Sequence, residues 1–441
     1  MQRTGIVELG GHVGKTVSIS GWVDVRRDHG KLVFLDVRDR SGKVQVICQT
    51  NHAEALAEAQ SLRPEWVVQV EGVVNERPEK MRTHEQNGNL ELEATNIAVL
   101  ARAQELPFEK DTEVNLDTYL DYLPLTLRSE RARAVFKVQA EITNAYRGFL
   151  ALEGFTEFQA PALVGGDAEG AAAAFTVNYY YDQKAYLATS PQLYKQIMVG
   201  VFERVFATPK VFRGEKHATT RHLSEYCSLD FEMGFIKDHR DVMDVLTRLM
   251  HAIMTQLQMN CKREFTLFEV EFPAAPKEFP ILKLREAQKI LGIGEEPDLE
   301  PEHERAICKW AREEKGSDFV FITHYPVKKR PFYTYEDEND PGFTKSFDLL
   351  FRGLEITTGG QRVHDYDTLV QKARDKGLDP EKFSFYLQAF KYGMPPHGGS
   401  ATGLERLTAR LLNLQNVKEA TLFPRDLNRI DTLLSDDDAK K

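Results

Sequence analysis

The sequence predicts an α+β protein in two domains, a small N-terminal β-barrel and a larger domain of strands and helices. A chain of 441 residues is too long for one ordinary hydrophobic core. Residues 1–103 carry short β-type runs separated by turn signals, whereas residues 131–441 add long amphipathic helical patterns. The segment 104–130 contains prolines and mixed charges without a clean period, which predicts a linker or hinge.

The composition is that of a globular protein, with 42% hydrophobic and 28% charged residues. No apolar run approaches the roughly 18 residues of a membrane-spanning helix, and the N-terminus lacks the apolar stretch of a signal peptide. We therefore expect a cytoplasmic protein without a membrane partner. The net charge of −10 means that any nucleic-acid binding would depend on a local basic surface.

Five strand-like segments and one helical segment occupy the N-terminal domain. The strands are predicted at 16–25, 31–37, 43–47, 67–74 and 90–100, and the helix at 53–62. This inventory suits a small Greek-key barrel of the oligonucleotide-binding (OB) type, although a generic small β-domain has the same elements.

Alternation along the strands separates an inner from an outer face of this barrel. Phe34 and Gln45 fall together on the outer face, where an aromatic ring beside an amide suits base stacking and edge recognition. Arg26, Arg27 and Lys31 add positive charge nearby. An exposed phenylalanine is common, so this pattern leaves the nucleic-acid role open. The residues predicted to face inward are Val33, Leu35, Val37, Val44 and Val46.

Two long helices are predicted in the C-terminal domain. Apolar residues from Val135 to Phe149 step by three and four, and Gly154 marks the end of that helix before a strand at 156–159. A second helix is expected from 241 to about 259. Its methionines are expected in the core: Met243, Met250 and Met254.

Residues 212–226 form the first block with candidate ligand-binding side chains. A strand that ends at Arg213, a polar loop and a second strand predict an antiparallel pair. The planar guanidinium of Arg213 suits a phosphate, and Glu215 could accept from an amine. The alternative is a surface salt bridge, which contributes about 0–1 kcal/mol.

Residues 347–362 form the second block. A two-residue turn at 352–353 would pair Leu350 with Glu355 and bring Asp348 and Glu355 onto one face as diagonal neighbours. Two carboxylates so close repel unless a cation lies between them, and magnesium with ATP phosphates is the natural occupant. Arg362 supplies a second planar fork.

Residues 398–406 form the third block, a glycine-rich run that leads into a helix expected at 407–412. A glycine-rich turn followed by Arg406 suits a nucleotide. The run has neither the Walker A sequence nor the dinucleotide-binding spacing, so it is weak in isolation.

Together the three blocks resemble the three motifs of class II aminoacyl-tRNA synthetases, and nearly the whole chain resembles aspartyl-tRNA synthetases. The long helix with Pro161 resembles motif 1, the dimer-forming element. The span between motifs 2 and 3 is short, as in the compact archaeal and eukaryotic type. The resemblance implies an OB-fold anticodon-binding domain and a catalytic domain with a mostly antiparallel sheet flanked by helices. The stretches that carry it are 190–196, 219–223, 357–362, 422–426 and, in the barrel, 21–45.

The resemblance also implies roles for individual residues. Arg213 and Arg406 would be catalytic, holding the α- and γ-phosphates of ATP. The ATP-binding set would be Arg213, Glu215, Arg221, His222, Leu223, Tyr226, Glu355, Gly403, Leu404, Glu405 and Arg406. Mg²⁺ would be held by Asp348, Glu355 and Thr358. Aspartate would be bound by Glu169, Gln192, Lys195, Arg213, Thr358 and Arg362. The anticodon would be read by Arg27, His29, Phe34 and Gln45.

Substrate choice would follow from two cations. Lys195 and Arg362 would grip the aspartate side-chain carboxylate through charge-assisted bonds of roughly 1.5–3 kcal/mol each. Asparagine would turn an amide NH₂ toward them, a mismatch that can discriminate by about 10⁴-fold. The α-carboxylate would attack the ATP α-phosphorus and release pyrophosphate, and the 3′-hydroxyl of tRNA would then attack the aspartyl-adenylate.

The expected partners are L-aspartate, tRNA(Asp) and a second copy of the chain in a homodimer. His29 leads to the hypothesis that tRNA(Asn) is charged as well. The alternatives are an asparaginyl-tRNA synthetase, an asparagine-synthesising paralogue and a non-catalytic nucleic-acid-binding protein that uses the barrel alone. The last alternative leaves Arg213, Asp348, Glu355 and Arg406 without a role.

Overall fold

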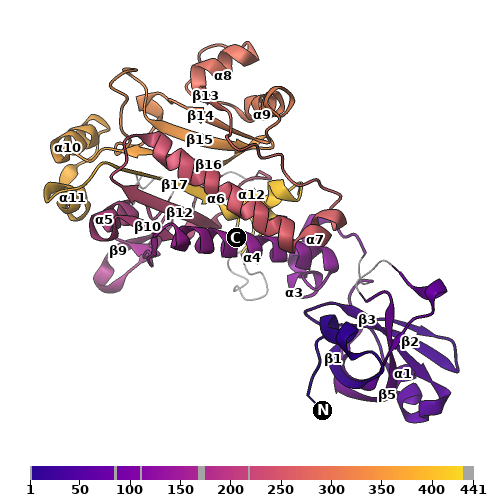
Figure 1. Cartoon of the computed structure of the whole chain (residues 1–441). Helices are drawn as coiled ribbons and strands as arrows, with labels where there is room; N and C mark the ends of the chain where they lie inside the picture. The colour runs from indigo at the N-terminus through magenta and orange to yellow at the C-terminus, as the bar shows by residue number, and fades with distance from the viewer. Residues whose placement is uncertain (1, 84–86, 110–111, 167–173, 217–218, 431–441) are drawn as a thin grey trace. The chain divides into compact units, whose positions relative to one another are not determined.

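A computed structural model describes residues 2–83, 87–109, 112–166, 174–216 and 219–430 of the chain (Figure 1). Its internal contacts divide the chain into two compact units, Met1–Thr112 and Glu113–Lys441. In the described residues, no helix combines the length and the apolar character needed to cross a membrane.

Five strands close the N-terminal unit into a barrel in the order β1-β2-β3-β5-β4, as the OB-type prediction requires. Every residue predicted to face inward is buried. The short 3₁₀ helix η1 (Ile6–His12), which the sequence did not predict, adds Ile6 and Leu9 to the same core. The strands and the α-helix of this unit are β1 (Thr16–Asp28), β2 (Leu32–Arg38), β3 (Lys43–Gln49), α1 (Ala53–Ser61), β4 (Val67–Glu76) and β5 (Leu90–Ala101).

Two short helices, α2 (Leu116–Asp121) and α3 (Leu123–Thr126), lie in the segment for which the sequence indicated no helical period. The Asn115 side chain caps α2 by accepting from the Thr118 amide at 2.9 Å. Arg429 contacts Asp121 at 2.5 Å, which joins α2 to the end of the C-terminal unit. Helices of one or two turns are too short to show an amphipathic repeat, which is why the pattern did not reveal them.

A mostly antiparallel sheet forms the centre of the C-terminal unit. Its order is β13-β14-β15-β16-β17-β12-β10-β6, and β11 pairs with β12. The pairs β13–β14 and β10–β6 are parallel, and the other described neighbours are antiparallel. The strands are β6 (Thr156–Glu157), β10 (Arg204–Ala207), β11 (Lys210–Phe212), β12 (Glu225–Gly234), β13 (Ile281–Lys283), β14 (Phe319–Thr323), β15 (Ser346–Phe351), β16 (Leu354–Arg362) and β17 (His397–Gly403). A smaller sheet contains β7 (Leu163–Val164), β9 (Lys184–Leu187) and β8 (Thr176–Asn178).

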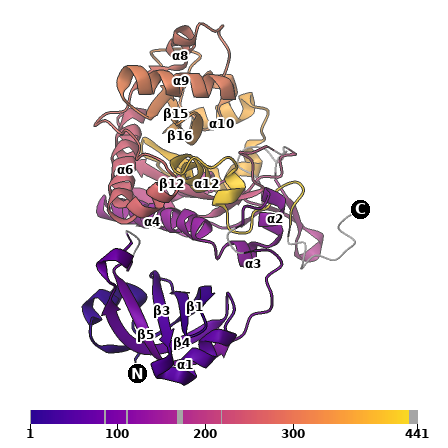
Figure 2. The same cartoon turned by 90° about the vertical axis from the view of Figure 1, so that its right-hand side faces the viewer.

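Two long helices, α4 (Glu130–Leu152) and α6 (His239–Asn260), pack on this sheet through the apolar faces that the sequence predicted. The three methionines of α6 are buried in that core, as expected. Helix α8 (Leu284–Leu291) contacts β13 and β14, and helix α9 (Pro301–Lys315) contacts β14 and lies beside β15 (Figure 2). The remaining helices are α5 (Gln192–Phe202), α7 (Lys262–Leu267), α10 (Tyr366–Asp375), α11 (Ser384–Lys391) and α12 (Leu404–Leu411).

Candidate active site

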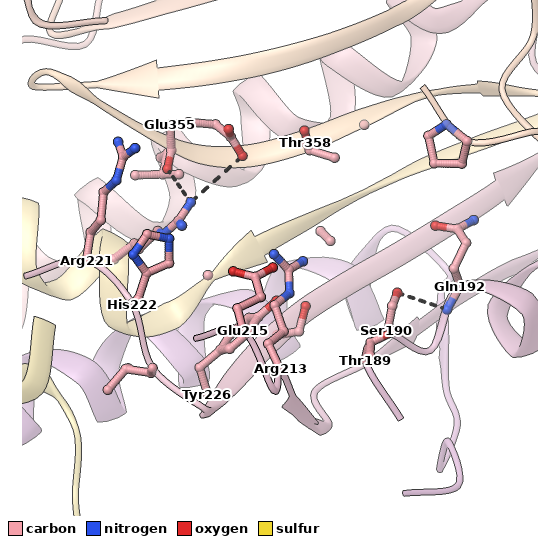
Figure 3. Close-up of a pocket in the computed structure, with 18 of the residues that line it drawn as sticks. Thr189, Ser190, Gln192, Arg213, Glu215, Arg221, His222, Tyr226, Glu355 and Thr358 are labelled. Atoms are coloured by element: carbon pink, nitrogen blue, oxygen red, sulfur yellow. Dashed lines mark hydrogen bonds and ion pairs between the residues drawn. The ribbon is translucent and has the colours of Figure 1, made fainter. Parts of the chain in front are cut away.

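A cavity of about 370 Å³ opens on the C-terminal unit, over the strands β12, β16 and β17. Figure 3 shows labelled side chains from separate parts of the chain that converge on it. The predicted site residues that line it are Gln192, Arg213, Glu215, Arg221, His222, Leu223, Tyr226, Glu355, Thr358, Arg362, Gly403, Glu405 and Arg406.

The antiparallel pair β11–β12 carries the first block, as predicted. Phe212 pairs with Glu225, so the intervening loop returns to the sheet where β12 begins. The Arg213 guanidinium lies over the Tyr226 ring, 5.5 Å from its centroid, beside the cavity (Figure 3). This wall of the cavity therefore presents a guanidinium and an aromatic ring, side by side, to a ligand that binds there.

The hairpin β15–β16 carries the second block. Leu350 pairs with Glu355, as predicted, and Arg352 and Gly353 take the left-handed φ values of 46° and 83° that a tight turn requires. A bulge beyond this pair shifts the register, so that Asp348 lies opposite Thr358 and accepts a hydrogen bond from its hydroxyl.

The acidic groups of this hairpin influence one another. Burial, reinforced by the negative charge of Asp348, raises the pKa of Glu355 to about 7. Arg406 lies 3.9 Å from the Glu355 carboxylate and donates to its backbone carbonyl at 3.3 Å. One cation, the guanidinium of Arg406, therefore lies beside the carboxyl group of Glu355.

Arg330 is a cavity residue that the sequence reading missed. Its Nη2 lies 2.7 Å from Asp348, and its Nη1 lies 3.4 Å from the Thr358 hydroxyl. The guanidinium also lies 3.9 Å from the centroid of the Tyr325 ring. Arg330 follows a short 3₁₀ turn (Val327–Lys329) in a loop outside the recognisable motifs, so no local pattern pointed to it.

Lys195 and Arg362 meet the same carboxylate, that of Glu232. Lys195 Nζ lies 2.9 Å from Asp230 and 3.2 Å from Glu232, and Arg362 Nε donates to Glu232 at 2.8 Å. Burial would raise the pKa of Glu232, but the charges of Arg362 and Lys195 hold it below its ordinary value. Asp230 and Glu232 were missed, and their signal was two acids that alternate with Leu229, Phe231 and Met233 in the buried half of strand β12.

Several predicted residues lie elsewhere than on the cavity wall. Lys195, Asp348 and Leu404 are buried behind it and do not appear among the lining residues. Glu169 lies outside the described residues. Glu304 of α9, which the sequence reading missed, accepts from the Glu355 amide at 3.2 Å and lies 3.9 Å from Arg221.

The predicted anticodon residues gather on the outer face of the barrel. Arg27 pairs with Phe34 across β1 and β2, and Asp36 pairs with Gln45 across β2 and β3. Arg27 Nη2 lies 3.2 Å from Asp36, an acid that the sequence reading did not single out. The ring of His29 meets that of Phe34 edge-on, with centroids 6.0 Å apart.

Comparison with known proteins assigns both units to families. Residues 115–427 match the family of class II tRNA synthetases (D, K and N), and residues 17–100 match the OB-fold nucleic acid binding domain. The aspartate–tRNA(Asp/Asn) ligase of Thermus thermophilus is 45% identical, over 97% of this chain and 99% of that protein. The aspartate–tRNA(Asp) ligase of Pyrococcus abyssi is 39% identical, over 95% of this chain and 96% of that protein.

Solved structures of both asparaginyl and aspartyl enzymes resemble this chain. The asparaginyl-tRNA synthetase from Pyrococcus horikoshii, complexed with asparaginyl-adenylate, superposes with a TM-score of 0.89 at 32% identity, covering 98% of this chain and 99% of that one. A putative aspartyl-tRNA synthetase from Leishmania major gives a TM-score of 0.84 at 29% identity, covering 97% of this chain and 94% of that one. The chain therefore belongs to the class II tRNA synthetases (D, K and N) and, within them, to the family of aspartate–tRNA ligases.

Proposed function

We propose that this chain activates L-aspartate with ATP and transfers the aspartyl group to the 3′ end of tRNA. The observation that carries the proposal is the buried ion network of Lys195, Glu232 and Arg362, which reaches the cavity wall at Arg362. A substrate carboxylate would reach this network at Arg362, with the charge of Lys195 behind it, whereas a neutral amide would offer one acceptor fewer. The names of the relatives, which are 39–45% identical, support the same substrate.

ATP would bind along the cavity wall that carries Arg213, Tyr226 and Arg406. The two guanidinium groups would hold the α- and γ-phosphates and stabilise the charge that develops as pyrophosphate leaves. Tyr226 and Arg406 would enclose the adenine. The further nucleotide contacts would come from Glu215, Arg221, His222, Leu223, Glu355, Gly403, Leu404 and Glu405.

Asp348, Glu355 and Thr358 fit a magnesium ion by their chemistry. Two carboxylates and a hydroxyl are the hard oxygen donors that this ion prefers, and it completes its shell with phosphate oxygens and water. Burial and, after it, the charge of Asp348 raise the pKa of Glu355 to about 7, and a bound cation would lower it again. Bound magnesium would neutralise charge on the ATP phosphates.

The amino-acid end of the site would be formed by the groups nearest α5. Lys195 and Arg362 would bind the side-chain carboxylate of aspartate, and Arg213 would bind its α-carboxylate. Gln192 and Thr358 would orient the substrate, and Glu169 would act from the loop that covers it. Glu232 is a positioning residue in this scheme, because it holds both cations in place.

Arg27, His29, Phe34 and Gln45 would bind the anticodon of tRNA(Asp). We also infer that tRNA(Asn) is charged, because relatives from Thermus thermophilus and Deinococcus radiodurans carry the name aspartate–tRNA(Asp/Asn) ligase. Charging assays with separate tRNA(Asp) and tRNA(Asn) transcripts test this inference. Absence of aspartyl product on tRNA(Asn) would reject it.

The domain roles and the assembly follow from the same proposal. Residues 1–103 would bind the anticodon, residues 104–130 would link the domains, and residues 131–441 would catalyse. Strand β6 ends the described order of the large sheet, and both its residues are exposed, so α4, β6 and Pro161 would meet a second copy in a cytoplasmic homodimer. Light scattering of the purified chain measures this assembly.

Amino-acid-dependent exchange between ATP and pyrophosphate, tried with all twenty amino acids, tests the enzyme. Aspartate should drive exchange, and Arg213→Ala should abolish it while the fold is retained. Exchange driven by asparagine would indicate an asparaginyl enzyme. Formation of free asparagine would indicate the synthesising paralogue, and RNA binding without any exchange would indicate a non-catalytic protein.

A further inference from the structure

We propose that His397, Gln196 and Tyr386 form a buried hydrogen-bond relay that holds the amide of Gln192 with its oxygen toward the cavity, the orientation in which Gln192 can accept from the α-ammonium of the amino acid that it would orient. The inference rests on the proposed function and assigns positioning roles to three residues that have no role in that proposal. These residues come from α5, α11 and β17, elements that are distant in the sequence.

The relay begins at a backbone carbonyl. His397 Nδ1 lies 2.9 Å from the carbonyl oxygen of Pro395, which can only accept, so Nδ1 carries the proton. Burial lowers the pKa of His397 to about 4, which keeps the imidazole neutral at physiological pH. Nε2 of this ring is therefore an acceptor.

The side-chain amide of Gln196 links the ring of His397 to Gln192 and fixes which atoms donate and which accept. Its Nε2 lies 2.9 Å from His397 Nε2, and since that ring nitrogen accepts, the amide of Gln196 donates to it. The amide oxygen of Gln196 then faces the other way, where it accepts from the Tyr386 hydroxyl at 3.2 Å and from Gln192 Nε2 at 3.1 Å. Gln196 and His397 are fully buried, so water does not compete for these bonds.

Gln192 lies at the cavity end of the relay. Gln192 and Gln196 are four residues apart on α5 and therefore share one face of that helix. Because Gln192 Nε2 donates to Gln196, Oε1 is the amide atom left for the cavity, and Figure 3 shows this oxygen on the side of the other labelled residues. An ammonium group has only donors, so it requires an acceptor such as this oxygen.

The opposite amide orientation would present NH₂ to the substrate ammonium, with donor facing donor. Because the relay excludes this orientation, the Gln192 amide does not have to be ordered when the amino acid binds, and that free-energy cost of binding is avoided. The relay therefore favours an α-amino acid as ligand. A dicarboxylate without an ammonium group has no donor for a hydrogen bond to Gln192 Oε1.

The test uses the full-length protein and the variant Gln196→Met, which keeps the side-chain volume and removes both hydrogen-bonding groups. The KM for aspartate is measured in ATP–pyrophosphate exchange, together with the inhibition constant of succinate, which is aspartate without its α-ammonium. We expect the KM for aspartate to rise about tenfold or more, the scale of one lost bond to a charged group. The inhibition constant of succinate and the KM for ATP should change less than about twofold, because neither ligand loses a hydrogen bond to Gln192.

Two further variants keep the test decisive. Gln288→Met removes another buried glutamine amide, on α8, whose Nε2 donates to the Glu296 carbonyl at 2.6 Å outside the cavity, and it should leave all three constants unchanged. Tyr386→Phe removes a single donor to Gln196 and should shift the aspartate-to-succinate ratio in the same direction by a smaller factor, even if Gln196→Met does not fold.

Equal losses for aspartate and succinate, or no change in their ratio, would overturn the relay. Absence of aspartate-dependent exchange in the unmodified protein would instead reject the proposed function. The two failures are therefore distinguishable in one set of assays.

Discussion

Arg330 donates from Nη2 to the carboxylate of Asp348 at 2.7 Å, so a guanidinium holds one of the two acids proposed to bind magnesium. The pair is largely shielded, with 15% of the Arg330 side chain and 6% of the Asp348 side chain exposed. Arg330 thereby compensates the charge of Asp348 when no metal is bound.

Replacing Arg330 by methionine should make the metal-free protein depend on divalent cations for stability. Removing one partner of a buried ion pair costs about 3–5 kcal/mol, and partial exposure places this case at or below the lower end of that range. Urea unfolding, measured with EDTA and with Mn²⁺, should show a loss that the metal largely restores. Lys328→Met, at an exposed neighbouring cation, is the control. An equal loss with and without the metal would contradict the compensation.

Replacing Lys195 by methionine should both destabilise the protein and abolish aspartate-dependent exchange. Asp230 and Glu232 would keep their charges with one cation removed, in a site where Lys195 and both acids are fully buried. The double variant Lys195→Met, Glu232→Gln should recover part of the unfolding free energy without activity. If Lys195→Met alone had the same unfolding free energy as the parent, Lys195 would not be required to stabilise the charges of Asp230 and Glu232.

The pH dependence of stability should reveal the raised pKa of Glu355, which is about 7 in the folded protein against an ordinary value of 4.5. The folded state therefore binds more protons than the unfolded state between these values, so this group's contribution to stability falls as pH rises from about 4.5 to about 7. Urea unfolding of the parent and of Glu355→Gln, from pH 5 to 8 with EDTA, should show a shallower decline in the variant. Identical profiles would count against the assignment.

Divalent ions should bind more tightly as pH rises toward 7, because the proton on Glu355 competes with the metal. Mn²⁺ titration followed by paramagnetic resonance measures this affinity without an activity assay. Glu405→Gln is a matched control, since burial also raises the pKa of Glu405 to about 7 but its carboxylate accepts from the Cys227 amide. That control should keep the pH dependence of Mn²⁺ binding.

Phe34→Ala should weaken charging of tRNA without affecting amino-acid activation. Loss of one stacked base costs about 1–3 kcal/mol, or roughly 5- to 150-fold in affinity. Steady-state charging should show the rise in the KM for tRNA, and ATP–pyrophosphate exchange without tRNA should remain unchanged, since Phe34 and the cavity belong to different units. A parallel loss of exchange would mean that the substitution disturbs more than RNA binding.

The barrel, the long helices and the hairpin turn at 352–353 could be read from the sequence because each is encoded by local patterns. Alternating Val33, Leu35 and Val37 mark a strand with one buried face, and positions three and four apart mark α4 and α6. The motif residues could be recognised because they follow one another closely along the chain.

The partners of those residues were decided by tertiary structure. Arg362 and Glu232 lie 130 positions apart, and Gln196 and His397 lie 201 apart, so their contacts depend on how β16, β17, β12 and α5 pack together. No local pattern records which buried side chain will face which. Burial then requires each polar group to find a partner, and that requirement sets the ion network around Lys195 and the orientation of Gln192.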